Sequence, residues 1–158
     1  MNLLTRLFGD PEEINGGNRC PTYMYRWTIA KWRGRGIYLH HFVADDWSLD
    51  LHDHPKRFIS IGLKGGYIEL TPGYDPTDRT CDRQVVYMAP WIRSFPAEHI
   101  HRLEMFRSHP TGEIRDCWTL VIVLKPVRSW GFWHLGKFIP WREYVKSETA
   151  KEMKACGD

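Results

Sequence analysis

Short runs in which apolar and polar residues alternate fill the middle of the chain. Such alternation predicts β-strands, because successive side chains of an extended chain point to opposite faces. The runs lie at residues 37–43, 58–63, 67–70, 84–89, 100–106 and 117–124. Residues 91–95 extend the fourth run after a bend, and residues 130–138 supply one or two further strands. The run at 117–124 is the most apolar, so we expect it at the centre of a sheet.

Three segments outside these runs have helical spacing. Residues 21–33 place Tyr23 and Trp27 on one stripe, and glycines follow where the helix would end. Residues 1–8 predict one or two amphipathic turns, and residues 141–154 predict a C-terminal helix. We therefore expect a helix at each end of a β-rich chain.

A glycine turn separates two of the strand-like runs. Lys64, Gly65 and Gly66 lie between the run at 58–63 and the run at 67–70. Two such runs around a tight turn predict a β-hairpin, with the segment at 52–54 at the mouth of its first strand.

Seven or eight short strands with turns between them indicate an all-β fold. Ten prolines and thirteen glycines are scattered along the chain, which suits many turns and argues against a helical bundle. The pattern predicts a β-sandwich or a small closed barrel such as a jelly roll. A length of 158 residues suits one domain. We divide it into a helical arm at 1–35, a barrel at 36–140 and a C-terminal helix and tail at 141–158.

Charge and composition exclude several classes of partner. The net charge is +3 and there is no dense run of Lys and Arg, so no specific nucleic-acid partner is expected. No run approaches the roughly 20 apolar residues of a membrane span. The cysteines Cys20, Cys81, Cys117 and Cys156 form no CxxC pair, and no signal peptide is evident. We therefore expect a cytoplasmic protein with reduced thiols.

Two histidine pairs are the candidate chemistry. His52 and His54 are separated by one residue, so on an extended strand their imidazoles share a face and can share a metal ion. The alternative is a pair of polar residues at a strand end. A second cluster, His99 and His101, lies in a similar position before a later strand and favours the metal site.

These residues resemble the two motifs of the cupin superfamily (RmlC-like jelly rolls). His52 and His54 match the HxH of the first motif, and Gly65 or Gly66 matches its late glycine. Pro96 and His101 match the second motif in spacing. The acidic residue of the first motif is absent, since its place falls at Phe58 or Ile59, and Glu98 replaces the glycine of the second motif. The chain also resembles small cupin-like proteins of bacteria and phages, which share its HDHP, GGY and WGFW segments.

The resemblance implies a jelly-roll barrel that holds a divalent metal ion. His52, His54 and His101 match the ligands of that ion, and the missing acid makes the site similar to the three-histidine Fe(II) sites of thiol-dioxygenase-like cupins. Fe(II) is expected first, with Zn(II), Ni(II) or Mn(II) as alternatives. His99 is a fourth ligand, a donor to a ligand, or a surface histidine. His40 either supports the site or is a core histidine.

Three further residues are candidates for the reaction itself. Glu98 is a general base if its turn points inward. Arg57 and Tyr67 are candidates for substrate contact, although Tyr67 is equally a packing residue. The functional expectation is a metal-dependent enzyme, either an Fe(II) oxygenase for a small anionic or thiol substrate or an isomerase. The alternatives are a non-catalytic small-ligand or carbohydrate-binding module and a phage-type accessory protein. A homodimer is also expected.

Overall fold

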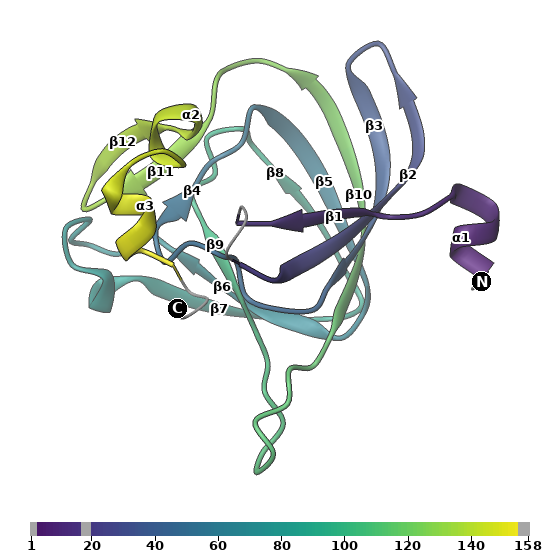
Figure 1. The fold of residues 1–158 in the computed structure, drawn as a ribbon, viewed down its shortest axis with the longest axis horizontal. Coiled ribbons are helices and arrows are strands. Elements are labelled where there is room, and N and C mark those ends of the chain that lie inside the picture. Colours follow the sequence, from purple (N-terminus) through teal and green to yellow (C-terminus); the bar gives the residue numbers. More distant parts are fainter. Residues whose placement is uncertain (1–2, 17–19, 155–158) are drawn as a thin grey trace.

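The computed structural model describes residues 3–16 and 20–154, which form a barrel of antiparallel strands (Figure 1). One wall is a six-stranded sheet with the order β1-β2-β3-β10-β5-β8. Its strands are β1 (Glu12–Asn15), β2 (Thr22–Trp32), β3 (Arg35–Phe42), β10 (Cys117–Pro126), β5 (Lys56–Lys64) and β8 (Trp91–Phe95). The most apolar run is β10, and it lies between β3 and β5 as expected.

The opposite wall consists of two three-stranded sheets. One has the order β12-β11-β4 and the other the order β7-β6-β9. Their strands are β12 (Lys137–Pro140), β11 (Gly131–His134), β4 (Leu51–His52), β7 (Arg83–Met88), β6 (Gly66–Thr71) and β9 (Arg102–Met105). An antiparallel bridge between His52 and His101 joins β4 to the chain that enters β9. The two small sheets thus form one wall, and the expected jelly-roll barrel is confirmed.

The expected helix at residues 21–33 is wrong, because this segment is the long strand β2. Met24 points into the core of the barrel, whereas Trp27 stacks on Trp118 on the other side of the sheet at 5.8 Å between ring centroids. Both faces of β2 therefore carry large apolar side chains, and a bulge near Ile29 shifts the register. A strand with apolar side chains on both faces lacks simple alternation of apolar and polar residues. The spacing of the apolar residues in β2 therefore matched the pattern expected for a helix.

The expected hairpin of residues 58–63 and 67–70 is also wrong. Both strands exist, but β5 pairs with β10 and β8, whereas β6 pairs with β7 and β9. The glycine turn carries the chain from one wall of the barrel to the other. Gly65 has a φ of +70°, and a Cβ atom there would lie 2.0 Å from the Asp116 carbonyl oxygen. Only glycine fits this crossing without displacing backbone.

Short helices lie at both ends of the chain, as expected. They are α1 (Leu3–Phe8), α2 (Trp141–Tyr144) and α3 (Glu148–Glu152), and a short 3₁₀-helix η1 (Arg79–Cys81) precedes β7. Tyr144 in α2 is fully buried, and its ring stacks on Phe132 of β11 at 4.0 Å between centroids. The C-terminal segment is thereby fixed against the β11 side of the barrel.

The thiol prediction needs one correction. Cys20 is disulfide-bonded, so it is not a reduced thiol. Cys81 and Cys117 are free, and Cys156 lies outside the described residues. Within residues 3–16 and 20–154, no helix has the length and apolarity to cross a membrane.

Candidate metal centre

His52 and His101 are brought together by the sheet itself. The His52 N–H donates to the His101 carbonyl oxygen at 2.8 Å, and the His101 N–H donates to the His52 carbonyl oxygen at 2.9 Å. Residues paired in this way send their side chains to the same face of a sheet. Their imidazole centroids lie 5.0 Å apart. The register of the wall therefore juxtaposes two histidines that are far apart in the sequence.

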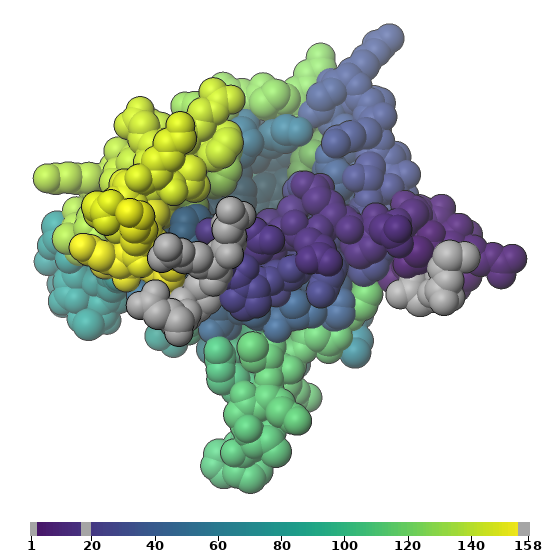
Figure 2. Space-filling view, in the orientation of Figure 1, coloured from purple at the N-terminus to yellow at the C-terminus, as the bar shows by residue number. Residues whose placement is uncertain are grey.

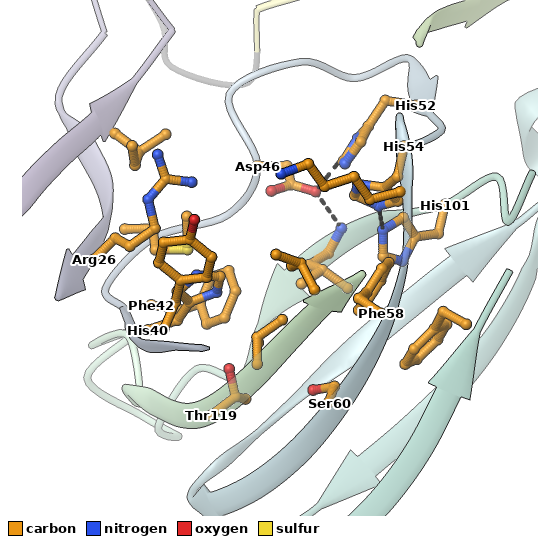
Figure 3. Close-up of a pocket in the computed structure, with 18 of the residues that line it drawn as sticks. Arg26, His40, Phe42, Asp46, His52, His54, Phe58, Ser60, His101 and Thr119 are labelled. Carbon is orange, nitrogen blue, oxygen red and sulfur yellow. Dashed lines mark hydrogen bonds and ion pairs between the residues drawn. The ribbon is translucent and has the colours of Figure 1, made fainter. Parts of the chain in front are cut away.

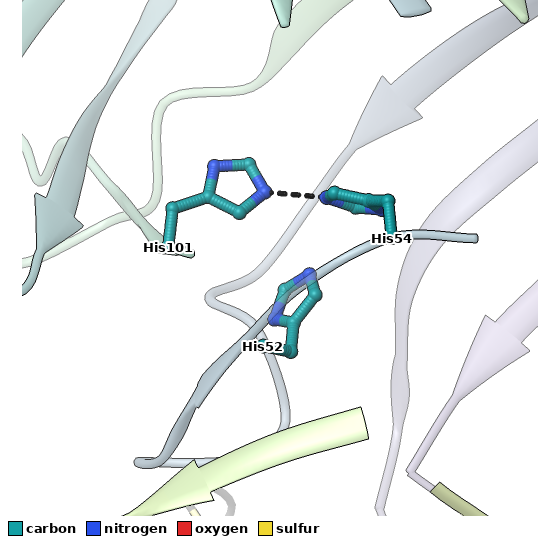
Figure 4. Close-up of side chains that lie close together, drawn as sticks. All are labelled: His52, His54 and His101. Carbon is teal, nitrogen blue, oxygen red and sulfur yellow. Dashed lines mark hydrogen bonds between the residues drawn. The ribbon is translucent and has the colours of Figure 1, made fainter. Parts of the chain in front are cut away.

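His54 completes the cluster from the connection between β4 and β5. It follows His52 by two residues, and its backbone N–H donates to the Ala97 carbonyl oxygen at 3.1 Å. Figure 4 shows its ring turned toward the other two imidazoles. One ring nitrogen from each of the three histidines lies within 4.8 Å of the others. The expected ligands thus form one group.

The separation of the ring nitrogens suits a shared cation. The Nε2 atoms of His54 and His101 are 2.8 Å apart. Two nitrogen ligands at right angles on a metal with bonds of about 2.0–2.1 Å would be about 3.0 Å apart. Two nitrogens at this separation share either one proton or one cation, so the rings need little movement to bind a metal.

Glu69 sets the orientation and tautomer of His101. This carboxylate is almost fully buried, and burial raises its pKa, but hydrogen bonds from His101 and His99 outweigh that effect and hold the pKa well below its usual range. An ionised carboxylate only accepts, so Nδ1–H of His101 donates to Oε1 at 2.7 Å. With Nδ1 directed at Glu69, Nε2 of His101 faces the cluster, as in other carboxylate–histidine–metal arrangements.

Burial favours the neutral form of two of the three imidazoles. It lowers the pKa values of His52 and His54 well below the ordinary range, and repulsion from any positive charge on the neighbouring imidazoles acts in the same direction. A neutral imidazole has the free lone pair that a metal requires. The donor set therefore fits a divalent ion.

Asp46 is a second carboxylate beside the cluster. Its Oδ2 atom accepts the Leu103 N–H at 2.8 Å and lies 3.9 Å from Nδ1 of His52. Burial raises the pKa of Asp46 to about 6, against the opposing effects of His101 and the Leu103 N–H. Asp46 thus stands where it can orient the His52 ring.

The three histidines line a cavity of about 470 Å³ inside the barrel. Most of its wall is apolar and aromatic, and the polar groups stand at a few separate points (Figure 3). Figure 2 shows a recess between the C-terminal segment and the end of the β2–β3 hairpin, where blue-teal atoms lie deeper in the molecule. The volume suits a small organic molecule.

The other residues predicted for the site lie in different places. Tyr67 is buried and lines the cavity. His99 does not line the cavity; its Nε2–H donates to Glu69 at 2.9 Å, so it belongs to the network behind His101. Glu98 and Arg57 are exposed, and neither lines the cavity. Their roles as general base and substrate contact stay predictions that no observed contact supports.

Two carboxylates of the site were missed by the sequence analysis. Glu69 was taken only as part of a strand and Asp46 only as a turn residue. Glu69 comes from a strand that is 32 residues away from His101, and Asp46 comes from the loop six residues before His52; neither position belongs to the HxH motif. Alternation offers one signal for Glu69, since it shares the inward face of β6 with Tyr67.

Comparison with solved structures finds the same fold. The chain is similar to a structure described as FeII HppE, with a TM-score of 0.51 and 9% identity over 72% of this chain and 56% of that chain. It is similar to a predicted oxalate decarboxylase from Thermotoga maritima, with a TM-score of 0.50 and 16% identity over 73% and 92% of the two chains. An RmlC-like cupin protein from Desulfovibrio desulfuricans gives a TM-score of 0.45 and 14% identity over 66% and 84%. Neither a protein-family model nor a curated protein matches the sequence. At these identities the likeness shows the fold alone.

Proposed function

We propose that this protein, whose fold is the double-stranded β-helix of the cupins, is a metal-dependent enzyme for a small anionic molecule. The observation that carries the proposal is the convergence of His52, His54 and His101 on the wall of the cavity inside the barrel. Three imidazole ligands place no negative charge in direct contact with a divalent ion. An anionic substrate group would therefore be favoured beside it.

Fe(II) is the metal that we propose first. A ligand set of three imidazoles suits Fe(II), with Zn(II), Ni(II) and Mn(II) as alternatives. The structurally similar HppE is described in its FeII form. A bound Fe(II) would supply the redox chemistry that a reaction with dioxygen requires. In a dioxygenase reaction both oxygen atoms enter the substrate, so no additional reductant is needed. A substrate that also carries a thiol fits the resemblance to thiol-dioxygenase-like cupins.

The residues of the chain have separate tasks in this proposal. Glu69 holds the proton on Nδ1 of His101 and so keeps Nε2 available as a ligand. Asp46 Oδ2, 3.9 Å from Nδ1 of His52, is placed to orient that ring. The apolar wall around Phe58 and Leu103 excludes water from the body of the substrate.

The test is oxygen uptake by protein loaded anaerobically with Fe(II) and then offered short carboxylic acids and small thiols. We expect uptake in wild type and in His109→Ala, whose histidine is exposed on a remote loop, and none in His52→Ala. Conversion of an acid without oxygen uptake would favour an isomerase. Tight metal-dependent binding without conversion would favour a non-catalytic binding module and overturn the enzymatic proposal.

The homodimer remains a prediction. Val86 and Met88 of β7 and Ile92 of β8 are exposed apolar side chains that a second copy could cover. Light scattering on the purified protein measures the oligomeric state directly.

A further inference from the structure

Two residues with buried, unpartnered polar atoms face each other on neighbouring strands of the cavity wall. Among the described residues, four buried side-chain nitrogen or oxygen atoms have no hydrogen-bond partner, and two of them are Nε2 of His40 and Oγ1 of Thr119. Both residues line the cavity. The other two atoms belong to Trp27 and Trp91, which do not line it. Buried polar groups that lack a partner cost free energy, so the pair marks a place where a bound group would be stabilised.

The register of the six-stranded sheet makes these residues part of one row. His40 of β3 faces Thr119 of β10 on one side and Arg26 of β2 on the other. All three residues line the cavity, as Figure 3 shows for the labelled side chains. Residues directly opposite one another on neighbouring strands have Cβ atoms about 4.5–5.5 Å apart. We call Arg26, His40 and Thr119 the polar row.

Arg26 is the one charged residue of the polar row, and a carboxylate outside the row pairs with it. Arg26 donates from Nε and Nη2 to the Glu12 carboxylate at 3.1 and 2.8 Å, so its charge is already paired. Burial lowers the pKa of His40 to about 3, and the charge of Arg26 contributes to this shift. His40 is therefore neutral near pH 7. A row with a paired cation, a neutral imidazole and a hydroxyl suits a neutral group that can both donate and accept a hydrogen bond.

The polar row lies apart from the histidine cluster. On β10 the inward residues after Thr119 are Val121 and Val123, and Val123 pairs with Phe58, whose ring contacts that of His54 at 4.8 Å between centroids. Four residues of strand span roughly 13 Å. Figure 3 shows Arg26 and His40 on one side of the cavity and the three histidines, with Phe58 beside them, on the other.

We propose that the polar row is a second subsite, which binds a hydroxyl or carbonyl group at the far end of the same substrate. The substrate would then be a two-headed molecule: an anionic head at the three histidines, a short apolar body and a neutral polar tail on His40 and Thr119. This inference deepens the function proposed above and rests on it for the anionic head. The tail subsite itself depends only on residues that are not metal ligands.

A pair of probe acids that differ only in the tail tests the proposal. The probes are 6-hydroxyhexanoate and hexanoate, and their dissociation constants are measured calorimetrically with Zn(II)-loaded protein and with chelator-treated protein. We expect the hydroxy acid to bind wild type about tenfold more tightly, because it pairs buried groups that hexanoate leaves unpaired. Thr119→Val should abolish the preference, and Thr119→Ser, which keeps the hydroxyl, should retain it.

The outcomes separate this inference from the proposed function. If wild type binds the two acids with equal affinity, the subsite is overturned, because a polar row that holds only water would give this result. If both acids also bind only in the presence of metal, the metal site is supported even though the subsite is not. A preference that persists in chelator-treated protein, with no effect of metal on affinity, would support the subsite and contradict the metal site. If neither acid binds either form, the subsite is also overturned. Should Thr119→Val not fold, His40→Phe, which removes the ring nitrogens of the same row, gives the same comparison.

Discussion

His52 and His101 exchange both backbone hydrogen bonds of an antiparallel pair, at 2.8 and 2.9 Å. This pairing joins β4 to the segment that enters β9, and it also brings the two imidazoles to a centroid separation of 5.0 Å. The same backbone pairing thus joins the two parts of the barrel wall and assembles the candidate metal centre. A variant that disturbs this register should lose both.

Glu69→Gln should weaken metal binding without removing a ligand. The amide cannot provide a carboxylate for Nδ1–H of His101, and loss of such a support typically costs 10–100-fold in metal affinity. Competition of the protein with a coloured chelator measures the affinity. Glu113→Gln, in an exposed loop, is the matched control and should behave as wild type. Equal affinity of Glu69→Gln and wild type would show that Glu69 does not support the site.

His40 should make stability depend on pH in the acid range. The pKa of His40 is about 3 in the folded protein and about 6.5 in an unfolded chain, so the unfolded state binds more protons between these values. The contribution of neutral His40 to stability is complete above about pH 6.5 and is lost as the pH falls toward 3. His40→Gln should reduce the slope of unfolding free energy by about 1 kcal/mol per pH unit in this window. Urea denaturation at several pH values measures it, and an unchanged slope would contradict the burial of His40.

Gly65→Ala should be far more damaging than Gly112→Ala. Both glycines have positive φ, +70° and +73°, so both substitutions carry the backbone cost of about 1 kcal/mol. Only at Gly65 would the new Cβ meet backbone, 2.0 Å from the Asp116 carbonyl oxygen, whereas nothing lies within 4 Å of it at Gly112. We expect a loss above about 3 kcal/mol for Gly65→Ala by urea denaturation. Equal losses would mean that the crossing between the walls is not tightly packed.

Tyr144→Phe tests how the C-terminal segment is fixed. The Tyr144 hydroxyl donates to Asp50 Oδ2 at 2.7 Å and lies 2.8 Å from Ser48 Oγ, all in the buried interior. Removing it leaves buried partners unsatisfied and should cost about 1–3 kcal/mol in thermal or urea unfolding. Tyr74→Phe is the control, since Tyr74 is 88% exposed, and it should change stability by less than about 0.5 kcal/mol. A neutral Tyr144→Phe would show that this network adds nothing to stability.

The strands and the histidine ligand group could be predicted from the sequence because both depend on local spacing. Alternation identified β10 and the other barrel strands, and the HxH pair together with His101 followed motif positions. The strand β2 was missed because large side chains on both of its faces removed the alternation. Single-strand patterns also do not say which strands pair, and so the crossing at Gly65 was taken for a hairpin.

The groups around the ligands were harder to predict, because they depend on contacts between distant segments. Glu69 reaches His101 from β6, and Asp46 reaches His52 from a loop before β4. The polar row depends on the pairing of β2, β3 and β10, which no residue in any one of these strands reveals. The contact of Glu69 and the polar row thus depend on the pairing between strands, whereas Asp46 reaches His52 through the path of a loop.

The shared cation of His52, His54 and His101 is tested most directly by elemental analysis after metal loading and gel filtration. The account predicts about one divalent ion per chain in wild type and in His109→Ala, and a large loss of metal in a folded His101→Ala variant. Wild type that retains no metal, or a folded His101→Ala variant that retains the wild-type amount, would contradict it.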